Sequence, residues 1–107
     1  MTCHIAGTSV SLEVPLSRVD MERPIRVGIR AGDILVASSL PQGLSARNVI
    51  AGSVVSLRQQ DVTVIAEVDC GARFVVHLTP GARQSLALEV GKQLWLVMKT
   101  YSCHILQ

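Results

Sequence analysis

The chain is divided into short apolar segments, each about as long as a β-strand and bounded by turn residues. Residues 25–30 show the clearest alternation, because Ile25, Val27 and Ile29 share one side of the segment. Such alternation predicts a strand with one buried face, since successive strand side chains point to opposite faces. Comparable segments recur at residues 8–15, 34–37, 49–57, 62–68, 73–78 and 93–100. This spacing favours a small all-β fold built from short strands.

One segment predicts a helix instead. Residues 80–88 follow Thr79, a good N-cap residue, and begin with Pro80, which suits the first helical position. Three strands, this helix and two further strands over residues 49–106 give the order of an OB-fold-like barrel. The segments within residues 8–37 add about three strands, which either complete this barrel or pair with a neighbour. We therefore predict an all-β, OB-fold-like small closed β-barrel with one short helix and extra N-terminal strands.

Polar stretches between the strands predict the connections, and the chain divides into two parts of one region. We expect residues 1–43 to form N-terminal strands and a connector, and residues 44–107 to form the barrel proper. The expected connections are a loop at 17–24, a connector at 38–43, a hairpin loop at 58–61 and a turn at 69–72.

Composition narrows the class of protein. The 107 residues suffice for one small domain, and with 49% apolar but only 3% aromatic residues its core must consist of Val, Leu, Ile and Ala. A net charge of +2 is too balanced for a strong nucleic-acid surface. No apolar run is long enough to span a bilayer, and the N-terminus lacks the features of a signal peptide. The odd count of three cysteines predicts reduced thiols in a cytoplasmic protein.

The segment Ser45-Ala46-Arg47-Asn48 carries the most chemistry in the chain, because it precedes a predicted strand with a hydroxyl, a backbone N–H, a cation and an amide. All four groups can donate hydrogen bonds, and charge-assisted bonds to an oxyanion are about twice as strong as neutral ones. Lys99 and Thr100 place a second cation beside a hydroxyl at the end of the last long strand. Turns are also rich in Ser and Asn for local reasons, so a plain loop remains the alternative.

The residues resemble a known family. Residues 43–52, the helix entry Thr79-Pro80-Gly81-Ala82-Arg83 and the strand Val97-Met98-Lys99-Thr100 are together similar to the Mop, or TOBE, molybdate-binding domain. Residues 26–37 look like the region just upstream of that domain in the ATPase subunit of bacterial molybdate importers. The resemblance covers roughly residues 25–103.

The resemblance implies an OB-like barrel that assembles as a homodimer or higher oligomer and binds molybdate or tungstate between barrels, with no other cofactor. Ser45, Ala46, Arg47 and Asn48 match the first binding loop, although Asn48 also suits a role in the turn. Lys99 and Thr100 match a late Lys-Ser pair, with Thr in place of Ser, and the backbone around Thr79 matches a further contact. The implied partners are the ATPase domain and the membrane permease subunits of an importer, at the inner face of the cell membrane.

One departure from the importer ATPases is large, because the chain lacks their Gly-x-x-x-x-Gly-Lys-[Ser/Thr] phosphate loop. The chain is therefore expected to be non-enzymatic, as the regulatory C-terminal domain of such a subunit. A free-standing molybdate storage protein and a barrel that only dimerises remain alternatives.

Two other site chemistries compete with the oxyanion reading. Cys3-His4 and Cys103-His104 could supply four zinc ligands if the termini met, but neighbouring strand residues point to opposite faces. Binding of single-stranded nucleic acid needs aromatic stacking surfaces, and the chain offers only Phe74, Trp95 and Tyr101. We expect no nucleic-acid partner, no catalytic role for His77 and no functional role for Cys70.

Overall fold

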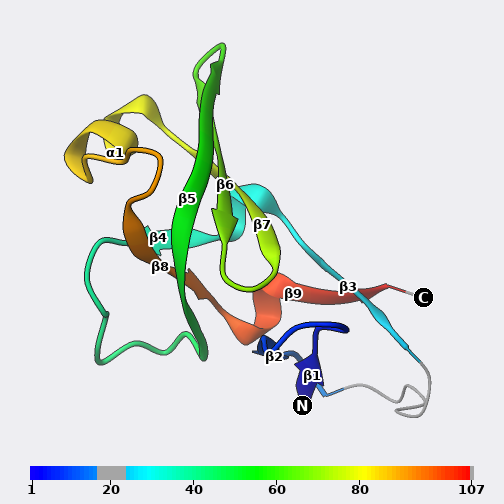
Figure 1. The fold of residues 1–107 in the computed structure, drawn as a ribbon. Coiled ribbons are helices and arrows are strands. Elements are labelled where there is room, and N and C mark those ends of the chain that lie inside the picture. Colours follow the sequence, from blue (N-terminus) through cyan, green and yellow to red (C-terminus); the bar gives the residue numbers. More distant parts are fainter. Residues whose placement is uncertain (17–23, 107) are drawn as a thin grey trace.

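The computed structural model describes residues 1–16 and 24–106, and the predicted all-β, OB-like architecture is confirmed over these residues (Figure 1). Short strands dominate, with one short helix and two 3₁₀ turns in the described part of the chain. No helix there has the length and apolar character needed to cross a membrane. The elements in order are β1 (Thr2–His4), β2 (Ser11–Glu13), β3 (Arg26–Ile29), η1 (Ala31–Asp33), β4 (Leu35–Ala37), β5 (Asn48–Gln60), β6 (Thr63–Asp69), β7 (Arg73–Leu78), α1 (Pro80–Ser85), β8 (Gln93–Met98), η2 (Thr100–Ser102) and β9 (Cys103–Leu106).

The long strand β5 organises the main sheet, whose strand order is β4-β8-β5-β6-β7. Its first half, from Asn48 to Ser53, pairs with β8, and its second half, from Ser53 to Gln60, pairs with β6. The register of β5 against β6 shifts between Val54 and Ser56, as at a β-bulge. Bulges bend a strand and increase its twist, which lets β5 leave one partner and join the other.

In the part of the chain that the structure describes, packing, and not strand pairing, brings the two edges of the main sheet together. The ladder order leaves β4 and β7 at the two edges of the sheet. The turn η1, which directly precedes β4, contacts β7 and so brings the two edges together. Beside this sheet, β3 pairs with β9, and β1 pairs with β2 in a hairpin at the N-terminus (Figure 1).

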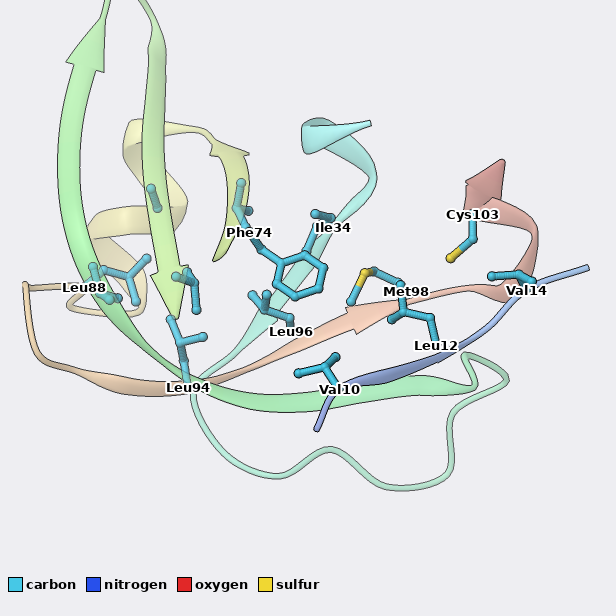
Figure 2. Packing of buried hydrophobic residues seen from close by; sticks show 14 residues of the cluster. Val10, Leu12, Val14, Ile34, Phe74, Leu88, Leu94, Leu96, Met98 and Cys103 are labelled. Carbon is cyan, nitrogen blue, oxygen red and sulfur yellow. The ribbon is translucent and has the colours of Figure 1, made fainter. Parts of the chain in front are cut away.

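The N-terminal hairpin contributes directly to the core. Leu12 and Val14 are 4% and 0% exposed, and they lie beside Met98, the last residue of β8, and Cys103, the first residue of β9 (Figure 2). The backbones of Met1 and Val14 exchange two bonds, of 2.6 and 2.7 Å, which closes the hairpin. The buried cluster as a whole comprises Val10, Leu12, Val14, Ile34, Val54, Ala66, Val68, Phe74, Leu88, Leu94, Leu96, Met98 and Cys103, together with Val76.

Several element boundaries in the structure differ from those that the sequence predicted. The predicted strand 8–15 is only Ser11–Glu13, and it pairs with a strand at Thr2–His4 that the sequence did not indicate. The predicted hairpin loop at 58–61 is wrong, because β5 continues to Gln60. The last long strand ends at Met98, and the helix ends at Ser85. The predicted loop at 17–24 lies outside the described residues except for Pro24.

The hairpin between β5 and β6 shows why the polar loop was misplaced. Arg58, Gln59 and Gln60 are exposed, yet they pair with β6 because both faces of this projecting end can meet water. The turn is made instead by Asp61, whose φ of 55° lies in the left-handed region that Asp tolerates, and by Val62. Val62 is 80% exposed, so it does not share the buried face of Val64 and Val68 that alternation predicted.

Candidate functional site

The two predicted cation segments meet at one end of the β5–β8 pair. Asn48 is paired with Met98 in the antiparallel register, so the next residue of each strand path, Arg47 and Lys99, lies just beyond the last pair. Lys99 still has an extended backbone, with φ −72° and ψ 149°. Both side chains are exposed, whereas Asn48 and Met98 are buried. The fold therefore places the two cations together on the solvent side of this end.

In the segment Ser45–Asn48, buried and exposed residues alternate. Ala46 and Asn48 are buried, whereas Ser45 and Arg47 are exposed. The Arg47 Nη2 donates to the carbonyl oxygen of Leu44 at 3.0 Å, which folds the guanidinium back over its own loop. A guanidinium has five N–H donors, so this bond leaves most of them available for another acceptor.

The second segment is fixed through the backbone of Lys99. The Lys99 carbonyl accepts a 3.0 Å bond from the Ser102 N–H and a 3.7 Å bond from the Cys103 thiol. These bonds form the η2 turn, which carries Thr100 at its start. The Thr100 hydroxyl lies 3.4 Å from Oε1 of Glu13, a residue of the N-terminal hairpin.

Asn48 is built into the fold rather than turned toward solvent. It is only 4% exposed, and its Oδ1 accepts a 2.7 Å bond from the Glu13 N–H. Its Nδ2 donates to the Glu13 carbonyl at 2.9 Å and approaches the Cys103 sulfur at 3.8 Å. The amide thus pairs with both backbone groups of one residue, and this geometry assigns Asn48 to positioning the loop. Its predicted contact with a ligand stays a prediction.

Thr79 lies at the opposite end of β5 from the other predicted residues. It follows Leu78, which pairs with Val64 of β6, and Val64 in turn pairs with Gln59 of β5. Because β5 has 13 residues, its ends are up to about 40 Å apart along the strand. The Thr79 hydroxyl accepts a 3.0 Å bond from the Ala82 N–H, which confirms its role as the N-cap of α1. A single chain does not bring Thr79 to Arg47.

The electrostatics of the Arg47–Lys99 end favour a bound anion. Arg47 and Lys99 lie just outside the β5–β8 ladder, and the repulsion between two cations at one end of a strand pair falls when an anion lies between them. The hydroxyls of Ser45 and Thr100 add neutral donors beside the two cations. Five of the seven predicted residues, namely Ser45, Ala46, Arg47, Lys99 and Thr100, therefore flank one surface, with Asn48 beneath it.

A groove of about 810 Å³ lies elsewhere, between the N-terminal hairpin, β3 and β7. Its lining is mainly apolar and includes Ile5, Val27, Ile29 and Phe74, but none of the seven predicted residues. Its chemistry does not suit an oxyanion, so we place the candidate site at the exposed β5–β8 end instead.

The structure gives no support to the zinc alternative. In residues 1–16 and 24–106, no three His, Cys, Asp or Glu side chains are arranged to hold a metal ion. Burial, followed by the charge of Cys3, raises the pKa of the Cys103 thiol. Burial, followed by the charge of Asp69, raises the pKa of Cys70 to about 11. Both shifts favour the protonated thiol in the folded chain.

Aromatic side chains do not form a stacking platform in the described structure. Phe74 is buried in the core, while Trp95 is half-buried and Tyr101 is exposed on η2. His77 is exposed on β7, at an edge of the main sheet. These positions give no support to the nucleic-acid alternative or to a catalytic histidine.

Comparison with known protein families identifies the family of more than half of the chain. The TOBE domain family matches residues 44–105, which include both segments of the candidate site. The chain belongs to the TOBE domain family. The match begins where the Ser45–Asn48 loop begins and ends in β9, so it also covers Thr79 at the far end of β5.

Proteins similar to this TOBE chain include molybdenum import ATP-binding proteins named ModC. The Mesorhizobium japonicum protein is 36% identical over 92% of this chain, and that of Rhizobium meliloti is 36% identical over 83%. The Escherichia coli K12 protein is 28% identical over 92% of the chain. The chain spans only 27%, 26% and 30% of the length of these three relatives, in their C-terminal region.

The fold is also found in a solved structure, that of the cytoplasmic molybdate-binding protein ModG with molybdate bound. The TM-score is 0.69, and the likeness covers 76% of this chain and 60% of that one. Sequence identity is 21%, so this likeness concerns the OB-like barrel fold alone.

Proposed function

We propose that the chain binds the oxyanion molybdate or tungstate at the surface formed by Ser45, Ala46, Arg47, Lys99 and Thr100. The observation that supports this proposal is the register of β5 against β8, which pairs Asn48 with Met98 and so brings the segments that carry Arg47 and Lys99 to the same end of the two strands in a TOBE domain. The hydroxyls, the backbone N–H and the two cations of this surface all donate hydrogen bonds, and the cations also carry positive charge. They therefore recognise the oxygens of the ion. No side chain needs to ligate the metal atom, and the role is non-enzymatic.

The distance from Arg47 to Thr79 supports a site shared between two chains. Thr79 occupies the end of β5 opposite the two cations, so its backbone joins the site only when a second copy supplies it. A homodimer arranged in this way binds ligand between barrels. Ligand that binds only the paired arrangement then stabilises it by mass action.

Selection of molybdate over sulfate follows from size rather than from charge. Both ions are tetrahedral dianions, but the oxygens of molybdate lie farther from its centre. Donors held at fixed spacing by a strand end and a 3₁₀ turn penalise a smaller ion that fails to reach all of them. The backbone bonds at Lys99 give this end the required rigidity.

We further propose that the chain acts as the regulatory C-terminal domain of an importer's ATPase subunit. The similarity to ModC proteins across most of the chain supports this role. In such a protein, ligand between paired barrels would hold the attached ATPase domains in an unproductive arrangement when cytoplasmic molybdate is plentiful. The partners would be those ATPase domains and the membrane permease at the inner face of the membrane.

A free-standing molybdate storage protein is the second candidate, because ModG shares the fold over 76% of this chain. The same site would serve it without an ATPase. Sequencing the coding region upstream of Met1 separates the two candidates. A phosphate-loop motif in the same reading frame supports the importer role, whereas a stop codon close upstream supports storage.

The site itself is tested by substitution of Arg47. Arg47→Ala should lower molybdate affinity at least about tenfold, because a charge-assisted bond contributes about 1.5–3 kcal/mol. Thermal melting with and without molybdate measures this effect, since a ligand at free concentration L that binds the folded state stabilises it by RT ln(1 + L/Kd) and so raises Tm less when its affinity falls. Arg73→Ala is the matched control, because Arg73 lies on β7 and pairs only at the surface with Glu67 at 3.3 Å. An Arg47→Ala protein that keeps the full molybdate-induced rise in Tm would remove Arg47 from the site.

A further inference from the structure

A carboxylate stands at the proposed oxyanion surface. Glu13 belongs to β2 of the N-terminal hairpin, outside the region that matches the TOBE family. Its neighbours Leu12 and Val14 are buried, which leaves the Glu13 side chain on the exposed side of the strand. The hairpin therefore brings a negative charge beside Thr100, the residue that follows Lys99 in the chain.

The backbone of Glu13 is fixed in this position by Asn48. The amide of Asn48 accepts from the Glu13 N–H at 2.7 Å and donates to the Glu13 carbonyl at 2.9 Å. Two bonds to one residue from a side chain that is 4% exposed leave little freedom for the backbone. Any rearrangement at this point must consequently come from rotation of the Glu13 side chain.

The Glu13 carboxylate also occupies a donor of the proposed site. Oε1 of Glu13 lies 3.4 Å from the Thr100 hydroxyl. An ionised carboxylate only accepts hydrogen bonds, so the hydroxyl must donate in this contact. A hydroxyl has one proton to donate, and a molybdate oxygen would need the same proton.

We propose that Glu13 is an internal competitor of the oxyanion and sets the affinity of the site. In the free protein its carboxylate accepts the hydrogen bond that the Thr100 hydroxyl donates, and an incoming dianion must displace this carboxylate against like charge. The wild-type affinity is then weaker than the donors alone would give, which suits a domain that responds to a rise in ligand rather than one that is always occupied. This inference rests on the oxyanion site proposed above.

The test compares molybdate affinities by calorimetric titration of the wild type, Glu13→Gln and Glu67→Gln. Glu13→Gln keeps the size of the side chain and removes its charge, so molybdate should bind about five- to tenfold more tightly at low salt. The gain should shrink as salt is raised, because exposed charges are screened. Glu67→Gln removes the same charge from β6, where Glu67 pairs with Arg73 at the surface at 3.3 Å, and its affinity should stay within about twofold of wild type.

A double substitution tests the contact with Thr100 directly. The gain from Glu13→Gln should be smaller in a Thr100→Val background, because no hydroxyl proton remains to compete for. Unchanged or weaker binding by Glu13→Gln, in a wild type that does bind molybdate, would overturn the competitor role and leave the site intact. Absence of binding by both the wild type and Glu13→Gln would instead remove the oxyanion site, and the competitor role with it.

Discussion

Asn48 connects two segments that are 35 residues apart in sequence, because its buried amide pairs with both backbone groups of Glu13. Replacing it by Ala removes the partner of the Glu13 N–H and of the Glu13 carbonyl, in a part-buried position. We expect Asn48→Ala to lower the free energy of unfolding by about 1–3 kcal/mol. Urea denaturation followed by circular dichroism measures this change.

Gln59→Ala is the matched control for Asn48→Ala. The Gln59 Nε2 also bonds to a backbone carbonyl, that of Asp61 at 3.1 Å, but the residue is exposed. Its loss should change stability by less than about 0.5 kcal/mol. Equal effects of the two substitutions would contradict the structural role of Asn48.

Cys70 gives the protein a specific dependence on alkaline pH. Burial, and then Asp69, raise the pKa of this thiol from 9.0 to about 11 in the folded chain. Between these two pH values the unfolded chain has already released the proton that the folded chain still holds, so the unfolded state gains stability. The free energy of unfolding should be fully retained below pH 9 and fall as the pH rises toward 11.

Urea denaturation at several pH values between 8 and 11 checks the Cys70 effect. In Cys70→Ser the loss of stability over this range should be smaller, because a serine hydroxyl does not ionise there. An equally steep loss in the Cys70→Ser protein would show that other groups cause it.

The sequence predicted the candidate residues near Arg47 and Lys99 because their chemistry is local. A cation beside a hydroxyl at a strand end is visible in a few consecutive letters. Glu13 was not predicted, since its relevance comes from contacts with Asn48 and Thr100, which lie 35 and 87 residues away. The sequence also did not show that Thr79 lies far from Arg47 and Lys99. That distance depends on the strand register, which the alternation of apolar residues does not determine.

Among the secondary-structure elements, the close approach of β5 to the end of β6 depends on Gly52. A Cβ built on Gly52 would lie 2.5 Å from the Cys70 sulfur and 2.9 Å from the Asp69 carbonyl oxygen. We expect Gly52→Ala to lower the free energy of unfolding by about 1–3 kcal/mol, the usual cost of overpacking. Thermal melting of the variant measures the loss.

Gly32→Ala provides the comparison for Gly52→Ala. Gly32 lies in η1, and a Cβ there would meet nothing within 4 Å. Its replacement should be neutral or slightly stabilising, because alanine restricts the unfolded chain. A Gly52→Ala protein as stable as the Gly32→Ala protein would mean that β5 and β6 separate at little cost.

Most strands of the described chain were predictable, and the misplaced boundaries share one cause. Strands 26–29, 35–37, 63–69 and 73–78 lie within the predicted segments or within one residue of them, because one face of each meets the core. At the projecting end of β5 neither face is buried, so the apolar pattern stops before the strand does. The strand at Thr2–His4 is too short for alternation to indicate it.

For the whole molecule, the division at residue 43 stays a prediction as a domain boundary. The structure shows strands from both sides of it in common ladders, since β3 pairs with β9 and β4 pairs with β8. The N-terminal hairpin also supplies Leu12 and Val14 to the shared core. We therefore expect the regulatory unit to include the N-terminal strands as well as the TOBE region.

The central claim is that this assembled unit binds molybdate at the Arg47–Lys99 end. Calorimetric titration of the intact chain with molybdate, tungstate and sulfate, with light scattering on the same samples, tests it most directly. We expect tight binding of molybdate and tungstate, weak binding of sulfate, and a ligand-bound species at least twice the mass of one chain. A stable dimer that gives no heat with any of the three ions would contradict it and leave a barrel that serves dimerisation alone.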